Sequence, residues 1–264
     1  MPSLTTTTAA SSQVSLSLKA SSSSSPAAPS PSAASSANST LRSLYPRAAK
    51  AFLQRDVALT HSLLASAFSV LEQAPPGTPD ALATPRRKWE ILRITFETTL
   101  YAAPPAPDPA ALPPALRAHL MLSPEPFVAT THARALQLFT PADRAQPSAA
   151  FLPAQILVTL ALASLKLDCT AVGRSMVEDW LARRGQEDVA EDAAGYAKVL
   201  ELYCLHLLPR LEEWDYADDF LRYEHELPAD TRKYSPCVRV SGSPMNIVDD
   251  PLTSTAVFWV AGHF

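Results

Sequence analysis

Glycine is scarce in this chain, which has six glycines against 25 prolines in 264 residues. No two of the glycines lie close enough to form a phosphate-binding loop, so the dinucleotide and P-loop fingerprints are absent. The prolines gather between segments of helical hydrophobic periodicity. Few glycines and many such prolines are more typical of an all-helical protein than of a sheet protein with tight turns.

Cysteine is equally sparse, and Cys169, Cys204 and Cys237 lie far apart. An odd, scattered set does not indicate a disulfide framework, and none of the three has a second Cys or His at metal-ligand spacing. We interpret them as inert thiols in a reducing compartment. The histidines are scattered without an HExxH motif, and we interpret the 224–226 Glu-His-Glu run as a solvated helix face.

Catalytic signatures are missing as well, since no serine lies in a GxSxG context. We therefore expect a protein that is not an enzyme, with no catalytic residues, no metal, no cofactor and no small-molecule substrate. The net charge is −4, yet the stretch from Glu178 to Glu226 holds 14 acidic and 5 basic residues. This distribution favours contact with a basic protein surface over contact with nucleic acid.

Acidic residues are absent before Asp56, and residues 1–40 are mostly Ser, Thr, Ala and Pro. Such a composition cannot offset the entropy of ordering, so it predicts a disordered tail. The alternative is a mitochondrial transit peptide, although the arginines begin only at Arg42. We expect an ordered domain over residues 41–234 and an irregular tail over residues 235–264, where helical periodicity ends.

Hydrophobic periodicity predicts a series of helices within the ordered domain. They lie at about 41–54, after Asp56, 85–102, 115–122, 126–139, within 145–165, after Asp168, over about 196–211 and after Asp215. The three aspartates are predicted N-caps, because a carboxylate there accepts from free backbone N–H groups. Pro46 is expected in a first turn and Pro209 at a kink or in a last turn.

The segment 145–165 has no charged residue, which raises the possibility of a membrane span. Polar residues and two prolines interrupt it, and the remaining apolar part is shorter than the ~20 residues that a bilayer requires. We therefore expect a central buried helix. Trp89, Trp180 and Trp214 are expected in the core.

The predicted helices pair into antiparallel hairpins of about 30–40 residues, the size of helical repeat units. The fold class predicted is all-α, with stacked antiparallel helical hairpins in a tetratricopeptide-like superhelix. The W-x2-L-G-x2-Y signature of that repeat is absent. Such stacks present extended faces to protein partners, so a binding function is favoured.

Two charged runs are candidate partner-binding residues. The compact basic run is Arg86, Arg87 and Lys88. The acidic run is Asp215, Asp218 and Asp219. Each also has a structural interpretation, as a solvated helix start or as a favourable charge at a helix N-terminus.

The region 157–221 resembles the peroxin twenty-six and peroxin fifteen family, tail-anchored peroxisomal membrane proteins. The resemblance lies in LVTLALASLKL, in AVGRSMVEDWLARR, and in GYAKVLELYCLHLLPRLEEWDYADDFL, where a long helix reaches Leu-Leu-Pro before an acidic helix. Upstream, LRSLYPRAAKAFLQRDVALTHSLLASAFSVLEQ resembles the opening hairpin of the family. The resemblance covers about 41–234.

The resemblance implies a non-enzymatic adaptor on the cytosolic face of the peroxisomal membrane. It would dock the peroxisomal AAA ATPases that export import receptors during matrix protein import. The membrane anchor of the family has no counterpart in residues 235–264, which we interpret as an aberrant or alternative end; a chain without the anchor would be cytosolic. The alternative is an unrelated soluble tetratricopeptide-like scaffold for protein–protein interaction.

Overall fold

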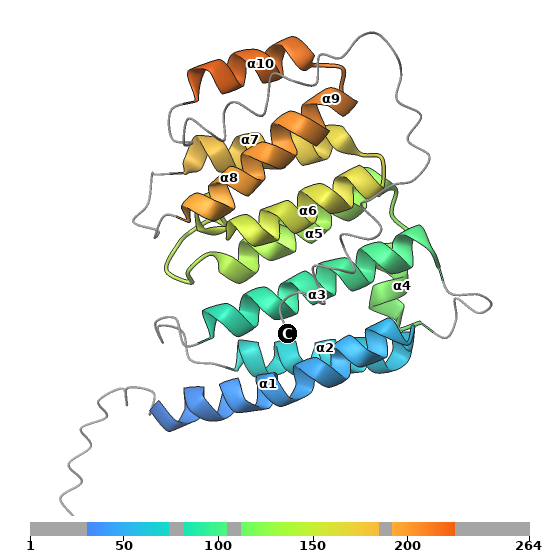
Figure 1. Ribbon diagram of the computed structural model, residues 1–264. Helices are drawn as coiled ribbons and strands as arrows, with labels where there is room; N and C mark the ends of the chain where they lie inside the picture. The colour runs from blue at the N-terminus through green and yellow to red at the C-terminus, as the bar shows by residue number, and fades with distance from the viewer. Residues whose placement is uncertain (1–30, 74–81, 105–111, 185–191, 225–264) are drawn as a thin grey trace, which may run out of the picture.

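The computed structural model describes residues 31–73, 82–104, 112–184 and 192–224, and this part of the chain is all-helical. Figure 1 shows the helices lying side by side in successive layers, from α1 and α2 at one end to α9 and α10 at the other. The helices are α1 (Pro31–Leu53), α2 (Val57–Glu72), α3 (Ala83–Ala102), α4 (Pro114–Leu120), α5 (Pro124–Phe139), α6 (Ala154–Lys166), α7 (Thr170–Arg183), α8 (Ala193–Leu202), α9 (Leu208–Arg210) and α10 (Trp214–Tyr223).

Two hydrophobic clusters form the core, and α3 contributes to both. Trp89, Leu92, Phe96 and Leu100 face the first cluster, together with apolar side chains of α1 and α2. Ile94 faces the second cluster, which continues through α5 to α10. The three- and four-residue steps between these four residues predict one buried stripe, which the structure confirms, but this helix is buried on a second side as well.

Three helix pairs turn through the same three-residue corner, at α1–α2, α6–α7 and α9–α10. The middle residue of each corner has a positive φ: 58° at Arg55, 55° at Asp168 and 62° at Glu212. In each corner the following N–H donates to the carbonyl five residues earlier, at 3.0, 2.9 and 3.0 Å. This is the Schellman arrangement, in which a left-handed residue ends the helix. The residue after it is the N-cap of the next helix.

The predicted capping aspartates occupy three different positions in these corners. Asp56 is an N-cap, and its Oδ1 accepts from the Leu59 N–H at 3.0 Å, so this prediction is confirmed. Asp168 is instead the left-handed residue, and the N-cap is Cys169. Asp215 lies inside the first turn of α10, one residue after its start. The predictions for Asp168 and Asp215 were therefore wrong. Asp168 lies one residue before the N-cap Cys169, and Asp215 lies two residues after the N-cap Glu213.

The N-terminal boundary also differs from the prediction, since α1 begins at Pro31 rather than near Leu41. Proline is favourable in the first turn, and the alanines that follow are strong helix formers. Ala37 packs against the first cluster, which anchors the added turns. Pro46 consequently lies inside α1 and not in its first turn, where it removes one backbone hydrogen bond. Residues 1–30 lie outside the described part.

The central and late helices follow the hydrophobic pattern closely. α6 buries nine of its 13 residues, in agreement with the predicted central helix. The step pattern over 196–211 predicts a stripe of eight inward residues, of which seven are buried and the last, Leu211, is half-buried. The seven are Tyr196, Val199, Leu200, Tyr203, Cys204, Leu207 and Leu208. Between α8 and α9 the chain makes a π-helical turn over Tyr203–Leu207, and Pro209 follows it in the last turn. No described helix is both long and apolar enough to cross a bilayer.

Candidate functional site

α10 is the most exposed long helix of the second cluster, and it covers one end of the stack (Figure 1). Ala217 is its one buried residue, and Phe220 and Leu221 are half-buried against the second cluster. A helix with three inward positions leaves most of its circumference to solvent. α10 is therefore held by a narrow apolar stripe and presents a broad outer face.

Three aromatic side chains of α10 are exposed to solvent. Trp214, Tyr216 and Tyr223 are 49%, 47% and 73% exposed. Aromatic side chains of this kind are enriched in the centres of protein interfaces. The expectation that Trp214 lies in the core was wrong, whereas Trp89 and Trp180 are buried as predicted.

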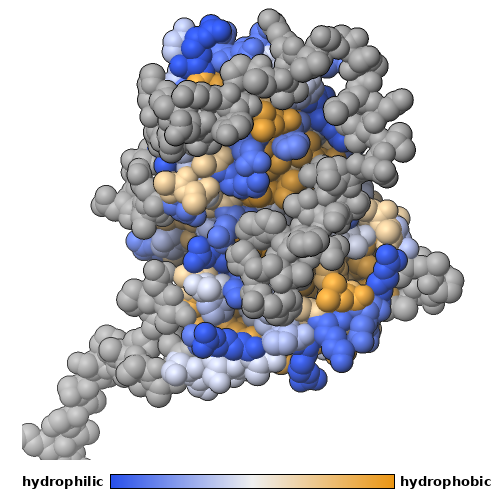
Figure 2. Space-filling model, viewed as in Figure 1, coloured by the Kyte–Doolittle hydropathy of each residue, from blue (hydrophilic) through white to orange (hydrophobic). Residues whose placement is uncertain are grey.

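Acidic side chains share this face. Asp215, Asp218 and Asp219, the predicted acidic candidates, are all exposed on α10. Figure 2, in the same orientation as Figure 1, shows mainly hydrophilic colouring at the end of the molecule that α10 forms. Asp219 accepts from Arg222 at 3.1 Å, an exposed pair of small energetic value. The acidic half of the predicted site thus lies on a surface that a partner can reach.

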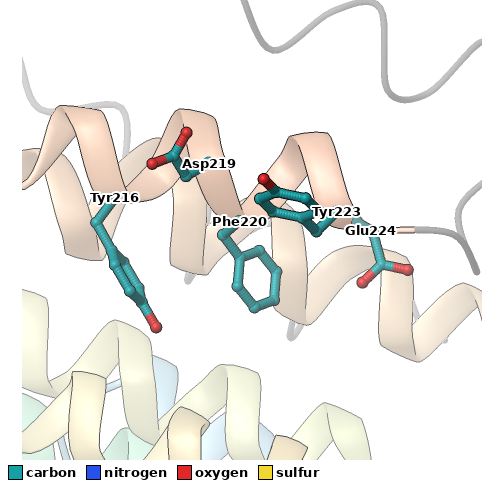
Figure 3. A pocket seen from close by; sticks show the side chains of 5 residues that line it. All are labelled: Tyr216, Asp219, Phe220, Tyr223 and Glu224. Carbon is teal, nitrogen blue, oxygen red and sulfur yellow. The ribbon is translucent and has the colours of Figure 1, made fainter.

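A hollow of about 290 Å³ lies on α10, lined by Tyr216, Asp219, Phe220, Tyr223 and Glu224. Figure 3 shows the rings of Tyr216 and Phe220 pointing toward the neighbouring helices, while Asp219 points away from them. The hollow is open to the surface, and three of its lining residues are aromatic and two are acidic.

Contacts with other helices hold the inner wall of this hollow. The Phe220 ring packs edge-on against Tyr203, with centroids 5.6 Å apart. The Tyr196 hydroxyl donates to Glu224 at 2.6 Å, and Glu224 is buried. The interpretation of Glu224 as part of a solvated face was therefore wrong; His225 and Glu226 lie outside the described residues. A carboxylate fixed by a buried hydroxyl is preorganised.

Arg174 of α7 links α7 to the start of α10. Its guanidinium forms ion pairs with Glu178 and with Glu213, and it lies 5.4 Å from the Tyr216 ring centroid. The Tyr203 hydroxyl donates to Glu178 at 2.8 Å. Burial and this neighbouring carboxylate raise the pKa of Tyr203.

The basic half of the predicted site is elsewhere. Arg86, Arg87 and Lys88 lie half-buried near the start of α3. Figure 1 places the layers of α5–α8 between α3 and α10. The structure therefore does not bring the two charged runs together, and they cannot form one compact site.

A second polar cluster lies between α3 and α5, and it is buried. Arg134 donates to Glu97 at 2.6 Å, and Arg93 pairs with Glu90, which is fully buried. Desolvation raises the pKa of Glu90, although the positive charges of Arg93 and Arg134 oppose this shift. His119 lies 3.6 Å from Glu97, and desolvation lowers its pKa. The Glu97–Arg134 pair links α3 to α5, whereas Glu90 and Arg93 both belong to α3.

The described cysteines are buried. Burial raises the pKa of Cys169 to about 11 and that of Cys204 to about 12, which agrees with their interpretation as inert thiols. Cys237 lies outside the described residues. Within the described part of the chain, no group of His, Cys, Asp and Glu side chains is placed to hold a metal ion.

Sequence reasoning missed the exposed tyrosines of α10, Tyr216 and Tyr223. Tyr216, Asp219 and Tyr223 are three and four residues apart, so a helix brings them to one side. That spacing was a usable signal. Comparison with known proteins adds no further assignment: no family model, no curated protein and no solved structure matches this chain.

Proposed function

We propose that this protein is a non-enzymatic adaptor that binds another protein through α10. The observation that carries the proposal is the exposure of Trp214, Tyr216 and Tyr223 beside three aspartates on one terminal helix. Exposed aromatics supply contact area at low entropic cost, and the carboxylates set partner choice and encounter rate. We call the outward side chains of 214–223 the α10 surface.

The partner we propose is the pair of peroxisomal AAA ATPases, at the cytosolic face of the peroxisomal membrane. Support comes from the resemblance of 157–221 to the peroxin twenty-six and peroxin fifteen family, since these residues run from within α6 into α10. The acidic, aromatic helix that ends the resembling region is the same helix that carries the exposed rings. A basic region on the partner would complement it.

The test is capture of the purified ATPase pair by the full-length chain in the presence of ATP. Changing Asp215, Asp218 and Asp219 together to Asn should weaken capture at least about tenfold, because the variant loses the charges that complement a basic partner. A tenfold change in affinity corresponds to roughly 1.4 kcal/mol. The matched charge change at the other predicted site, R86Q with R87Q and K88Q, should leave capture intact. No capture by the unaltered chain would refute the ATPase assignment.

A second candidate is an unrelated tetratricopeptide-like scaffold. Three corners of identical geometry, at Arg55, Asp168 and Glu212, favour a stack built from recurring helical hairpins. Affinity capture from cell extract, compared between the unaltered chain and the triple Asn variant, distinguishes the two. A set of α10-dependent partners that excludes the ATPases supports the scaffold.

A further inference from the structure

We propose that the hollow on α10 receives a basic side chain, preferentially an arginine, presented by the protein partner. The inference rests on the proposed adaptor function and assigns the chemistry of its partner. The hollow is lined by three aromatic residues, Tyr216, Phe220 and Tyr223, and by two acidic ones, Asp219 and Glu224. The Asp219 carboxylate lies at its rim and points away from the neighbouring helices (Figure 3).

The lining chemistry selects a cation. Ring faces attract a cation through their quadrupole, and a guanidinium adds stacking and paired hydrogen bonds to a carboxylate. A neutral apolar side chain would instead desolvate the exposed Asp219 carboxylate at the rim without giving it an opposite charge. A carboxylate ligand would meet like charge. Of the common side-chain classes, arginine therefore satisfies both halves of the lining.

The hollow is prepared for such a ligand before it binds. Tyr203 holds Phe220, and Tyr196 holds Glu224. Ordering of these walls has been completed on folding, which lowers the entropic cost of binding. Asp219 at the rim has Arg222 as a partner, but both side chains of this pair are more than half exposed, so an incoming guanidinium can replace it.

The same chain already places arginines on aromatic rings. Arg184 lies 3.8 Å from the Tyr196 ring centroid, and Arg93 lies 3.7 Å from that of Phe68. At the edge of the hollow, Arg174 approaches Tyr216 from the side of α7. Of these contacts, the one between Arg174 and Tyr216 involves α10, and the other two join other helices.

The probe is a short, fluorescein-labelled, end-capped peptide of alanine, leucine and arginine, titrated with the full-length chain and followed by fluorescence anisotropy. The matched probe contains citrulline in place of arginine, which keeps the planar shape and removes the charge. We expect the arginine peptide to bind at least about fivefold more tightly than the citrulline peptide, the fold-change that corresponds to ~1 kcal/mol. A lysine peptide should lie between them.

Variants place the binding in the hollow. D219N and Y223A should each weaken binding of the arginine peptide about fivefold, since the first removes the rim carboxylate and the second removes one ring of the lining. D143N and M121A remove an exposed carboxylate and an exposed apolar side chain elsewhere and should have no effect. Circular dichroism verifies the fold of each variant.

Several results would overturn the inference. Equal binding of the arginine and citrulline peptides would refute the preference of the hollow for a cation. Weakening by D143N equal to that by D219N would show that the peptide is attracted by the overall negative charge and not by the hollow. Tighter peptide binding by a variant with R232Q, K233Q and R239Q would place the chain's own residues in the hollow. A mass that rises with concentration and falls in D219N would assign the hollow to a second copy of the chain.

The outcome is separable from that of the proposed function. Capture of the ATPases without preference for the arginine peptide refutes the hollow and keeps the adaptor. Preference for the arginine peptide without capture of the ATPases keeps the hollow and refutes the named partner.

Discussion

The three Schellman corners provide a stability prediction with an internal replicate. Arg55, Asp168 and Glu212 all have a left-handed backbone, and all three side chains are exposed. An L residue in this conformation costs roughly 1–2 kcal/mol relative to glycine, and glycine returns roughly 0.5–1 kcal/mol of that through the greater freedom of the unfolded chain. Substitution with glycine should therefore stabilise each corner by roughly 0.5–1 kcal/mol.

The gain should differ among the corners. Aspartate tolerates the left-handed region better than arginine or glutamate, so D168G should give the smallest increase. The 3.7 Å contact of Asp168 with Arg210 is too exposed to alter this order. Because the corners are in different layers, the effects of R55G, D168G and E212G should add to about 1.5–2.5 kcal/mol. The melting temperature should rise by about 2–4 °C per kcal/mol.

Urea unfolding followed by far-ultraviolet circular dichroism measures these changes as shifts in midpoint at constant slope. Alanine at the same three positions keeps the Cβ atom and should give no gain. Glycine in a helix interior, as in A65G on the exposed side of α2, should cost roughly 1 kcal/mol. If R55G and E212G destabilise the protein as A65G does, the left-handed assignment of the corners is refuted.

Three further predictions concern buried groups. G173A should destabilise the protein by about 1–3 kcal/mol, because the added Cβ would meet Ser164 of the facing helix α6 at 2.1 Å from Oγ, and S164A should recover part of this loss in urea unfolding. E97Q should cost about 3 kcal/mol, since Arg134 loses its partner in a largely buried pair; a loss below ~1 kcal/mol would contradict a structural role for the network. Burial lowers the pKa of His132, so the unfolded chain binds the proton more tightly than the folded one, and the free energy of unfolding should fall as the pH drops below about 6.5. H132Q should make the free energy of unfolding less dependent on pH between about pH 7.5 and 5.5. An unchanged dependence on pH in this variant would contradict the prediction.

The sequence was sufficient to predict the burial of a side chain where that burial depends only on the side chain's position around its own helix. The step pattern of Trp89, Leu92, Phe96 and Leu100 identifies a buried stripe because every member lies on one side of a regular helix. The pattern does not report a second buried side. The residues near Glu97 in the sequence do not indicate that it pairs with Arg134, 37 positions away.

The candidate surface was predicted in part for a related reason. Periodicity identifies which side of α10 is apolar, through Ala217, Phe220 and Leu221, but it does not say whether another helix covers the remaining sides. The exposure of Trp214 and the burial of Glu224 both depend on the helices that pack against α10 and on those that do not. Only the arrangement of layers supplies that information.

The position of α3 has a consequence for how the molecule opens. Because this one helix is a wall of both hydrophobic clusters, separation of either half exposes apolar side chains of α3 and leaves the helix packed on one side alone. Amide hydrogens of α2 and α6 should therefore exchange with solvent through a single concerted opening, whereas α10, fastened by few inward side chains, should exchange through small local excursions. The stack would then join a cooperative body to a terminal helix that can yield independently.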